Sequence, residues 1–241
     1  MAVLEQDVEG ARRVISSGNS EIDKKMGGGI PEGSLILIEG ESNAGKSVVS
    51  QQLMHGALMS GTKVVLYTTE NTTRSFLRQM QSLSLDVTDF YLLGALNIYP
   101  VPAAFNADDA ATAFDRLLNH FRELEGRFDV IVVDSLTSFA SQLGEGPTLA
   151  FCTALKSLCD RNMTIFLTIH TAAFEEQMFS RLRSLCDAHL RLRIEELRGQ
   201  LIKLMEVAKV RGAQKMTGNI VAFDVDPGLG MKIIPVSKAQ A

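Results

Sequence analysis

The sequence has few cysteines, no long apolar run and no apolar leader, and each absence excludes a class of protein. Its cysteines are odd in number and form neither a C-x-x-C pair nor a zinc-binding spacing, which argues against a disulfide framework; they are Cys152, Cys159 and Cys186. No apolar stretch approaches the roughly 18 residues of a membrane-spanning helix. The N-terminus carries acids where a signal peptide has bases. We therefore expect a cytoplasmic protein in which Cys152 and Cys159 are small core residues.

Internal repeats and low-complexity segments are also missing, and the charge balance is mild. The 241 residues carry a formal net charge of −4, with 46% hydrophobic and 22% charged residues. This composition is typical of a globular chain, and the negative net charge argues weakly against nucleic acid as the main partner. The length suits a single domain over residues 1–241, in which residues 1–16 form a lead-in segment with some helical pattern.

One stretch has the form G-x-x-x-x-G-K-[ST], which is the pattern of a phosphate-binding loop. It consists of Gly40, Glu41, Ser42, Asn43, Ala44, Gly45, Lys46 and Ser47. An apolar run precedes it and a helix-compatible segment follows, so backbone N–H groups and the helix N-terminus should meet at one point. Lys46 can then reach the β and γ phosphates of a nucleotide, and the Ser47 hydroxyl can bind Mg²⁺. The alternative is a glycine-rich turn with an incidental lysine.

Strand and helix patterns alternate along the chain. Apolar runs predict strands at residues 35–38, 63–68, 90–93, 128–134 and 164–170. Amphipathic spacing predicts helices at residues 48–60, 74–83, 109–124, 147–161 and 175–185, whereas residues 94–108 are expected to be irregular. Further strands at 189–195, 200–209 and 220–225 follow, joined by turns. The expected fold is α/β, with a central, mostly parallel sheet flanked by helices and a C-terminal antiparallel edge extension.

Two carboxylates follow predicted strands, and the carboxyl ends of parallel strands meet at one edge of a sheet. Asp134 closes the strand at 128–134 and can order Mg²⁺ opposite Ser47; alternatively it caps the following turn. Glu70 follows the strand at 63–68 and can accept a proton from an attacking water; alternatively it stabilises the N-terminus of the next helix. Asp134 and Glu70 are therefore the candidate catalytic residues for nucleotide hydrolysis.

Four segments together resemble the RecA-type ATPases of the KaiC branch. They are residues 18–34 before the phosphate loop, Tyr67-Thr68-Thr69-Glu70, residues 128–135 and Lys209-Val210-Arg211-Gly212. The resemblance covers roughly residues 15–235 and implies a RecA-like P-loop NTPase fold that binds ATP with Mg²⁺. In the resembling family the K-x-R segment approaches the γ-phosphate of a neighbouring subunit. This assigns Lys209 and Arg211 to nucleotide binding across a subunit boundary; the alternative is a solvated basic edge strand.

Within that branch, the single-domain length and residues 228–236 are most similar to members from the archaeal flagellum, or archaellum. The similarity implies a cytoplasmic homo-oligomeric ring, expected to be a hexamer, beneath the membrane-embedded motor. The implied partners are the motor ATPase and a membrane-bound scaffold. Asn71 stands where many members have a second glutamate after Glu70, so we expect slow hydrolysis and a switching role for the nucleotide. Asn43 and Ala44 also depart from the common loop sequence and should leave binding intact.

Other functions of the same fold remain open. A recombinase-like ATPase would act on DNA through loops after the later strands. The corresponding segments, residues 138–146 and 171–176, contain no Lys or Arg and three Glu, so they would repel a phosphate backbone. A fast ATPase or a clock-type kinase is the other alternative, and steady-state turnover separates these from a nucleotide-gated assembly module.

Overall fold

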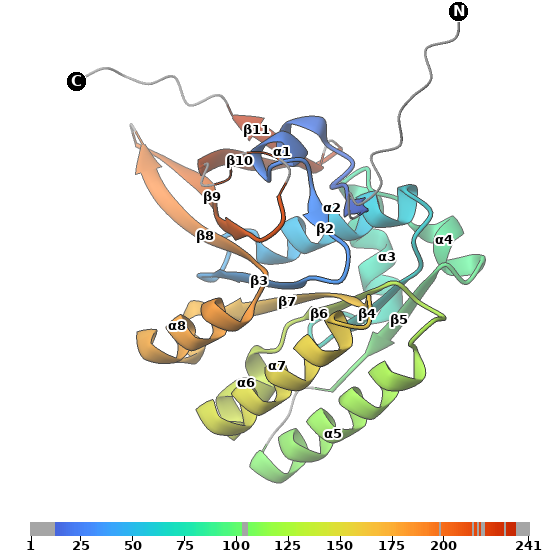
Figure 1. Cartoon of the computed structure of the whole chain (residues 1–241). Helices are drawn as coiled ribbons and strands as arrows, with labels where there is room; N and C mark the ends of the chain where they lie inside the picture. The colour runs from blue at the N-terminus through green and yellow to red at the C-terminus, as the bar shows by residue number, and fades with distance from the viewer. Residues whose placement is uncertain are drawn as a thin grey trace, which may run out of the picture.

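The computed structural model describes residues 13–102, 106–197, 199–213, 215, 217, 220–228 and 230–234. At its centre lies a nine-stranded sheet in the order β11-β10-β9-β8-β3-β7-β6-β4-β5 (Figure 1). The strands are β3 (Leu35–Gly40), β4 (Val64–Thr68), β5 (Leu96–Pro100), β6 (Val130–Asp134), β7 (Thr164–His170), β8 (Ala188–Leu197), β9 (Gln200–Val210), β10 (Ile220–Asp226) and β11 (Gly230–Ile234). A separate antiparallel pair joins β1 (Val14–Ile15) to β2 (Ile30–Pro31).

Helices cover both faces of the sheet (Figure 1). On one face lie α1 (Ser20–Lys25), α2 (Lys46–Met59), α3 (Thr73–Ser82) and α4 (Thr88–Leu92). On the other lie α5 (Ala107–Glu123), α6 (Thr137–Leu143), α7 (Glu145–Cys159) and α8 (Glu176–Leu185), the last preceded by a short 3₁₀ helix, η1 (Thr171–Ala173). Every helix in the described ranges is too short or too polar to cross a bilayer.

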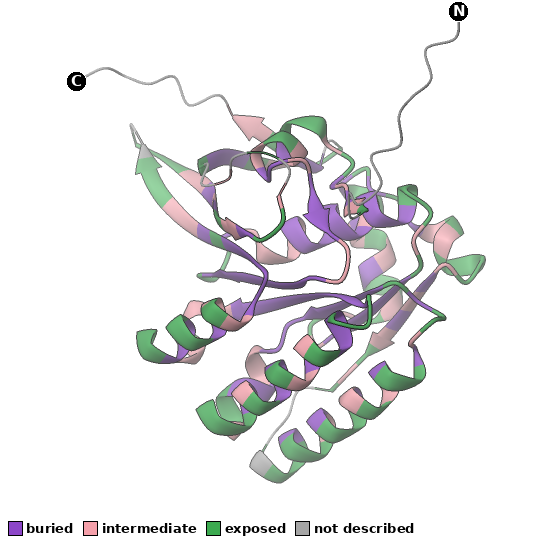
Figure 2. Ribbon diagram, viewed as in Figure 1, coloured by how far each residue is buried: buried purple, intermediate pink, exposed green. Residues whose placement is uncertain are grey.

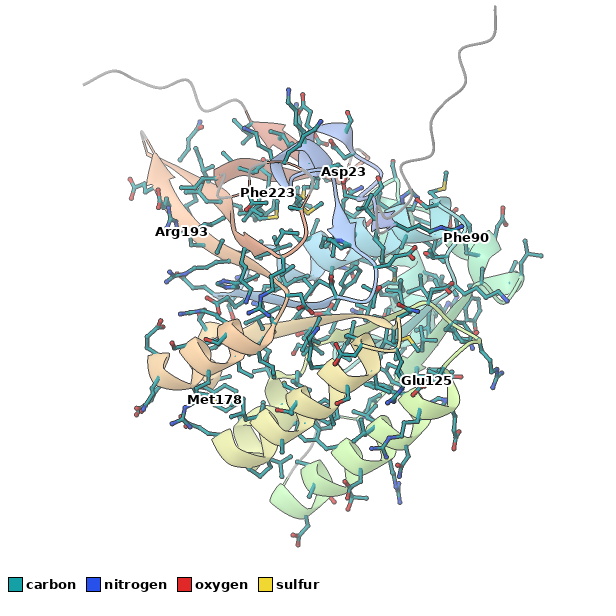
Figure 3. The ribbon with its side chains drawn as sticks, in the orientation of Figure 1. Asp23, Phe90, Glu125, Met178, Arg193 and Phe223 are labelled. Atoms are coloured by element: carbon teal, nitrogen blue, oxygen red, sulfur yellow. The ribbon has the colours of Figure 1, made fainter. Side chains whose placement is uncertain are left out.

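Each face of the sheet has its own hydrophobic core, which explains the uninterrupted apolar runs of the parallel strands. In β3, Ile36 and Ile38 pack in the core beneath α2, whereas Leu35 and Leu37 pack in the core beneath the α5–α8 layer. The strands β3, β4 and β6 are buried throughout, and β7 is buried up to its half-buried last residue, His170 (Figure 2). Met178 of α8 and Phe223 of β10 belong to opposite cores (Figure 3). All three cysteines are free and buried.

The register of the parallel strands brings their carboxyl ends to one edge of the sheet. Gly40 at the end of β3 pairs with His170 at the end of β7, and Thr68 at the end of β4 pairs with Asp134 at the end of β6. The residues that follow these strands therefore converge at the same edge.

Beyond β8 the sheet changes from parallel to antiparallel, as expected. β8 pairs in parallel with β3 on one side and antiparallel with β9 on the other. β10 and β11 continue the antiparallel extension to the edge. This extension folds back over the end of the sheet where α2 begins, because Phe223 of β10 lies against Gly45.

The strand predicted at residues 90–93 is wrong. These residues lie in α4 and the turn after it, and the strand is β5, in a segment expected to be irregular. β5 forms because β4 would otherwise expose its open edge: Val64 pairs with Leu96, and Leu96 and Ile98 are buried in alternation with half-buried neighbours. Local sequence does not reveal this pairing, since it depends on a partner strand about 30 residues away.

Two other segments differ from expectation. Residues 138–146, expected as a loop, lie mostly in α6, and Gly144 with a φ of 76° separates α6 from α7, so the helix predicted at 147–161 begins at Glu145. Residues 14–15 of the lead-in form β1 because they pair with β2. Residues 1–12 of the lead-in, and residues 229, 235 and 236 of the C-terminal segment, lie outside the described residues.

Candidate nucleotide-binding site

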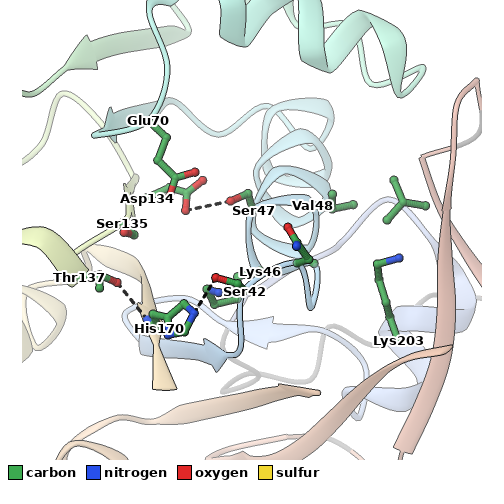
Figure 4. A pocket seen from close by; sticks show the side chains of 13 residues that line it. Ser42, Lys46, Ser47, Val48, Glu70, Asp134, Ser135, Thr137, His170 and Lys203 are labelled. Atoms are coloured by element: carbon green, nitrogen blue, oxygen red, sulfur yellow. Dashed lines mark hydrogen bonds between the residues drawn. The ribbon is translucent and has the colours of Figure 1, made fainter. Parts of the chain in front are cut away.

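A cavity of about 500 Å³ opens at the carboxyl edge of the parallel strands (Figure 4). The phosphate loop and the start of α2 line one side, and residues at or just after the ends of β4, β6 and β7 line the other. β9 and β10 contribute Lys203 and Val225. The structure thus brings the phosphate loop, Glu70 and Asp134 together in one cavity, of a size that suits a small-molecule ligand.

Backbone geometry explains the glycines at the two ends of the loop. At Gly40 a Cβ atom would lie 2.6 Å from the carbonyl oxygen of Leu192, so β8 can approach only a glycine. Gly45 is the N-cap of α2 with a φ of 96°, and Asn43 has a φ of 62°, a left-handed conformation that asparagine tolerates. Ala44 is fully buried in the core. Gly40 and Ala44 therefore shape the loop without lining the cavity.

The Lys46 side chain lines the cavity beside the phosphate loop. Lys46 is the first residue of α2, and its Nζ donates a hydrogen bond to the carbonyl oxygen of Glu41 at 2.7 Å. Burial lowers the pKa of Lys46, and the carboxylates of Asp134, Glu70 and Glu41 oppose this shift. A phosphate oxygen could replace the Glu41 carbonyl and would offer a full negative charge instead of a dipole.

Ser47 and Asp134 provide the oxygen atoms that Mg²⁺ prefers. The Ser47 hydroxyl donates to Asp134 Oδ1 at 3.3 Å, and the buried Thr168 hydroxyl donates to the same oxygen at 2.6 Å. Burial raises the pKa of Asp134, and these hydrogen bonds together with the Lys46 charge offset part of the increase. Within the described residues no three His, Cys, Asp or Glu side chains cluster as metal ligands. The donor set thus fits Mg²⁺, which binds through few protein oxygens, nucleotide phosphates and water.

Glu70 faces the cavity beyond Asp134 (Figure 4). Desolvation and, after it, the Asp134 carboxylate raise the pKa of Glu70, while Lys46 lowers it. The first turn of α3 is capped by Thr72, which accepts from the Ser75 N–H at 3.2 Å. Glu70 is therefore not needed as a helix cap, and its place and raised pKa suit a proton acceptor.

Asn71, the neighbour of Glu70, does not line the cavity. Its side-chain oxygen accepts a hydrogen bond from the Ser75 hydroxyl at 3.0 Å. The Asn71 side chain is thus turned toward α3. A glutamate at position 71 would need a different side-chain rotamer to reach the cavity.

Sequence reasoning missed His170. It closes β7, and its main-chain N–H donates to the Thr137 hydroxyl at 3.0 Å. Because Nδ1 accepts from the Ala172 N–H at 3.0 Å, the neutral ring carries its proton on Nε2, which lies 2.8 Å from Ser42 Oγ in the phosphate loop. Burial and the Lys46 charge lower the pKa of His170. The argument that found Asp134, a polar residue at the end of a buried strand, would also have found His170.

Lys203 was also missed, and no local signal marks it. It lies on β9, more than 150 residues after the phosphate loop, and reaches the cavity because the antiparallel strands fold back over α2. Its Nζ lies 3.6 Å from Asp224 Oδ1 on β10.

Comparison with known proteins agrees with this geometry. The family model described as "ATPase: KaiC" matches residues 15–238. The chain belongs to the KaiC family of ATPases. It is similar to the archaeal flagellar ATP-binding protein FlaH of Sulfolobus acidocaldarius, with 35% identity over 95% of this chain and 100% of that protein. The protein of the same name from Methanocaldococcus jannaschii is 30% identical over 91% of this chain and 94% of its own length.

The crystal structure of the flagellar accessory protein FlaH from Methanocaldococcus jannaschii superposes with a TM-score of 0.81 at 28% identity, and covers 92% of this chain and 99% of that one. The predicted RecA/KaiC-like α/β fold, with its antiparallel C-terminal edge, is therefore confirmed. Membership of this ATPase family implies ATP binding, typically with Mg²⁺.

In this KaiC-family chain, Lys209 and Arg211 do not reach the cavity. Lys209 on β9 pairs with His189, which pairs with Leu37, the third of the six residues of β3, whereas the phosphate loop follows the last of them. β9 ends at Val210, so Arg211 already lies in the turn before Gly212. Within one chain, the structure separates these two cations from the nucleotide site.

Proposed function

We propose that this chain is a single ATP-binding domain that works as a nucleotide-gated, ring-forming component of the archaellum motor, with slow or absent intrinsic hydrolysis. It would act in the cytoplasm, at the periphery of the membrane-embedded motor. Its partners would be the motor ATPase and a membrane-bound scaffold, and nucleic acid would not be among them. Lys46 and the loop N–H groups would hold the phosphates of ATP, and Ser47 and Asp134 would hold Mg²⁺.

One observation carries this proposal. A complete phosphate loop, with Ser47 and Asp134 3.3 Å apart, occurs in a chain that is similar over 95% of its length to a protein named for ATP binding and for the archaeal flagellum. A likeness limited to the phosphate loop would support nucleotide binding alone. The similarity over the full length extends the likeness to the whole chain and so supports the archaellum assignment.

The position of Lys209 and Arg211 supports a ring. Two cations at the end of the sheet opposite the ATP site can serve a nucleotide only in another copy of the chain. A head-to-tail interface that repeats in this way forms a ring when its rotation closes, and we propose that closed form here. A cation that meets the γ-phosphate across the boundary would make assembly depend on the third phosphate, since ADP leaves that charge unpaired.

Mass measurement of the full chain with Mg²⁺·ATP, with Mg²⁺·ADP and without nucleotide tests the proposal. We expect a closed oligomer, a hexamer, with ATP and a monomer in the other two conditions. A Lys46→Ala control should stay monomeric with ATP. Oligomers of equal mass in all three conditions would contradict nucleotide gating, and salt-dependent DNA retention on a filter would favour the recombinase-like alternative.

A further inference from the structure

A fully buried carboxylate lies directly before the phosphate loop. Glu39 is 0% exposed in β3, and Gly40 follows it. Arg183 of α8 binds it at two points, with Nε 3.1 Å from Oε2 and Nη2 2.8 Å from Oε1. His189 Nε2 lies 3.3 Å from Oε1, and Arg191 lies at 3.8 Å. Burial alone would raise the pKa of Glu39, but the contacts with His189 and Arg183 outweigh it and the pKa is lowered.

The same turn of α8 holds the two cations of the K-x-R segment. Lys209 Nζ donates to the main-chain oxygen of Arg183 at 2.6 Å, and Arg211 Nη2 donates to the main-chain oxygen of Ser184 at 3.2 Å. Asp187, just after α8, lies 3.7 Å from Arg211 Nη1. The last carbonyls of a helix carry partial negative charge and have no partner within the helix, so they attract cations.

Arg183 therefore takes part in two contacts, one directed toward the phosphate-loop end of β3 and the other toward the opposite end. Its side chain is bound to the residue before the phosphate loop, and its carbonyl is bound to Lys209. Its remaining guanidinium nitrogen pairs with Glu176 on the exposed side of α8. A pair that only attached α8 to the sheet could be apolar, because buried ion pairs give little net stability. The charged pair instead holds the Arg183 side chain against β3 through two directional hydrogen bonds.

We propose that Glu39 and Arg183 are a positioning pair that sets where the last turn of α8 holds Lys209 and Arg211, and so couples each subunit's own phosphate loop to the cations it offers to a neighbour. This inference rests on the proposed ring. In the isolated chain Lys209 and Arg211 donate hydrogen bonds to the last carbonyls of α8. These hydrogen bonds must break before either side chain can reach a neighbour's phosphate. If ATP binding to the adjacent loop shifts Glu39, Arg183 would transmit the shift to α8. This would change the free energy needed to break the hydrogen bonds of Lys209 and Arg211 with the α8 carbonyls. Binding of ATP in one subunit would then favour engagement of the next.

The test compares ATP binding by the monomer with ATP-dependent assembly of the full chain. Glu39→Gln keeps the shape of the side chain and removes its charge. We expect the Kd for Mg²⁺·ATP, measured at protein concentrations where the chain is monomeric, to change by less than about threefold. The ATP concentration for half-maximal assembly should rise by at least about tenfold, and the Hill coefficient should fall toward one, since coupling between sites is typically worth about 5- to 150-fold. Glu176→Gln is the matched control, because it removes the exposed partner of the same arginine, and it should assemble normally.

Should Glu39→Gln fail to fold, Arg183→Lys, which keeps the charge but loses the two-point contact, takes its place with the same expectation. Normal assembly of the Glu39→Gln variant would overturn the inference. So would a loss of assembly fully explained by weaker ATP binding in the monomer. Normal ATP-dependent assembly of the Arg211→Ala variant would refute the proposed ring contact itself. Loss of assembly in Arg211→Ala together with normal assembly in Glu39→Gln would refute only the positioning pair.

Discussion

Replacing Lys46 with alanine should weaken Mg²⁺·ATP binding by about 30- to 150-fold without unfolding the protein. At about 3 Å from a phosphate oxygen, the ammonium gains about 5 kcal/mol of gross attraction at an effective dielectric near 20. To reach the phosphate it must give up its 2.7 Å hydrogen bond to the Glu41 carbonyl, a charged contact worth about 1.5–3 kcal/mol. The remaining net contribution is about 2–3 kcal/mol, and each 1.4 kcal/mol corresponds to a tenfold change in Kd.

Isothermal titration with Mg²⁺·ATP measures this change, and thermal unfolding checks it. At ATP concentrations about 100 times the Kd of the unmodified protein, the ligand should add about 2.7 kcal/mol of stability, which would fall to about 0.3–0.9 kcal/mol in the variant. Lys203→Ala is the matched control: this lysine lines the same cavity but pairs with Asp224, and we expect a loss of less than about tenfold. An undiminished ATP-induced shift of the Tm in Lys46→Ala would refute the assignment of the phosphate site.

Three further predictions concern assembly, hydrolysis and pH. Arg211→Ala should leave ATP binding by the monomer within about threefold of normal, because the side chain lies at the far end of β3, yet remove ATP-dependent assembly; unchanged oligomer masses would contradict the role across the subunit boundary. Glu70→Gln should lower any hydrolysis by about 10²–10⁴-fold with binding preserved, whereas Asn71→Glu should raise turnover if the missing carboxylate limits the chemistry; turnover of the unmodified protein at tens per second, on the order of ordinary enzymes, would contradict the switch. Because the pKa of Glu39 is lowered, its ionised form stabilises the fold above the ordinary value of 4.5, and this contribution is lost as the pH falls through the folded-state pKa. The Tm difference between the unmodified protein and Glu39→Gln should therefore shrink on acidification below 4.5, and a difference that grew would show that another group dominates.

Local sequence determined most of the elements and the centre of the site. The apolar runs of β3, β4, β6 and β7 are buried on both faces, so the pattern alone identifies them. The phosphate loop is contiguous, and the positive φ of Gly45 is a local requirement for glycine, whereas the requirement at Gly40 comes from the close approach of Leu192 on β8. Asp134 follows from a simple rule, since a polar residue that ends a buried parallel strand must lie at the carboxyl edge of the sheet.

Tertiary structure decided what depends on partners distant in the chain. β5 is a strand because the open edge of β4 pairs with it, although its own residues include two half-buried polar side chains and a proline. Lys203 lines the cavity only because the antiparallel strands fold back over α2. Glu39 is a charged residue in an otherwise apolar strand, and the sequence does not show its partner. Its burial is tolerated because Arg183, 144 positions later, lies beside it. The location of Lys209 and Arg211 at the far end of the sheet follows from the antiparallel return of β9 along β8, a pairing direction that side-chain periodicity does not encode.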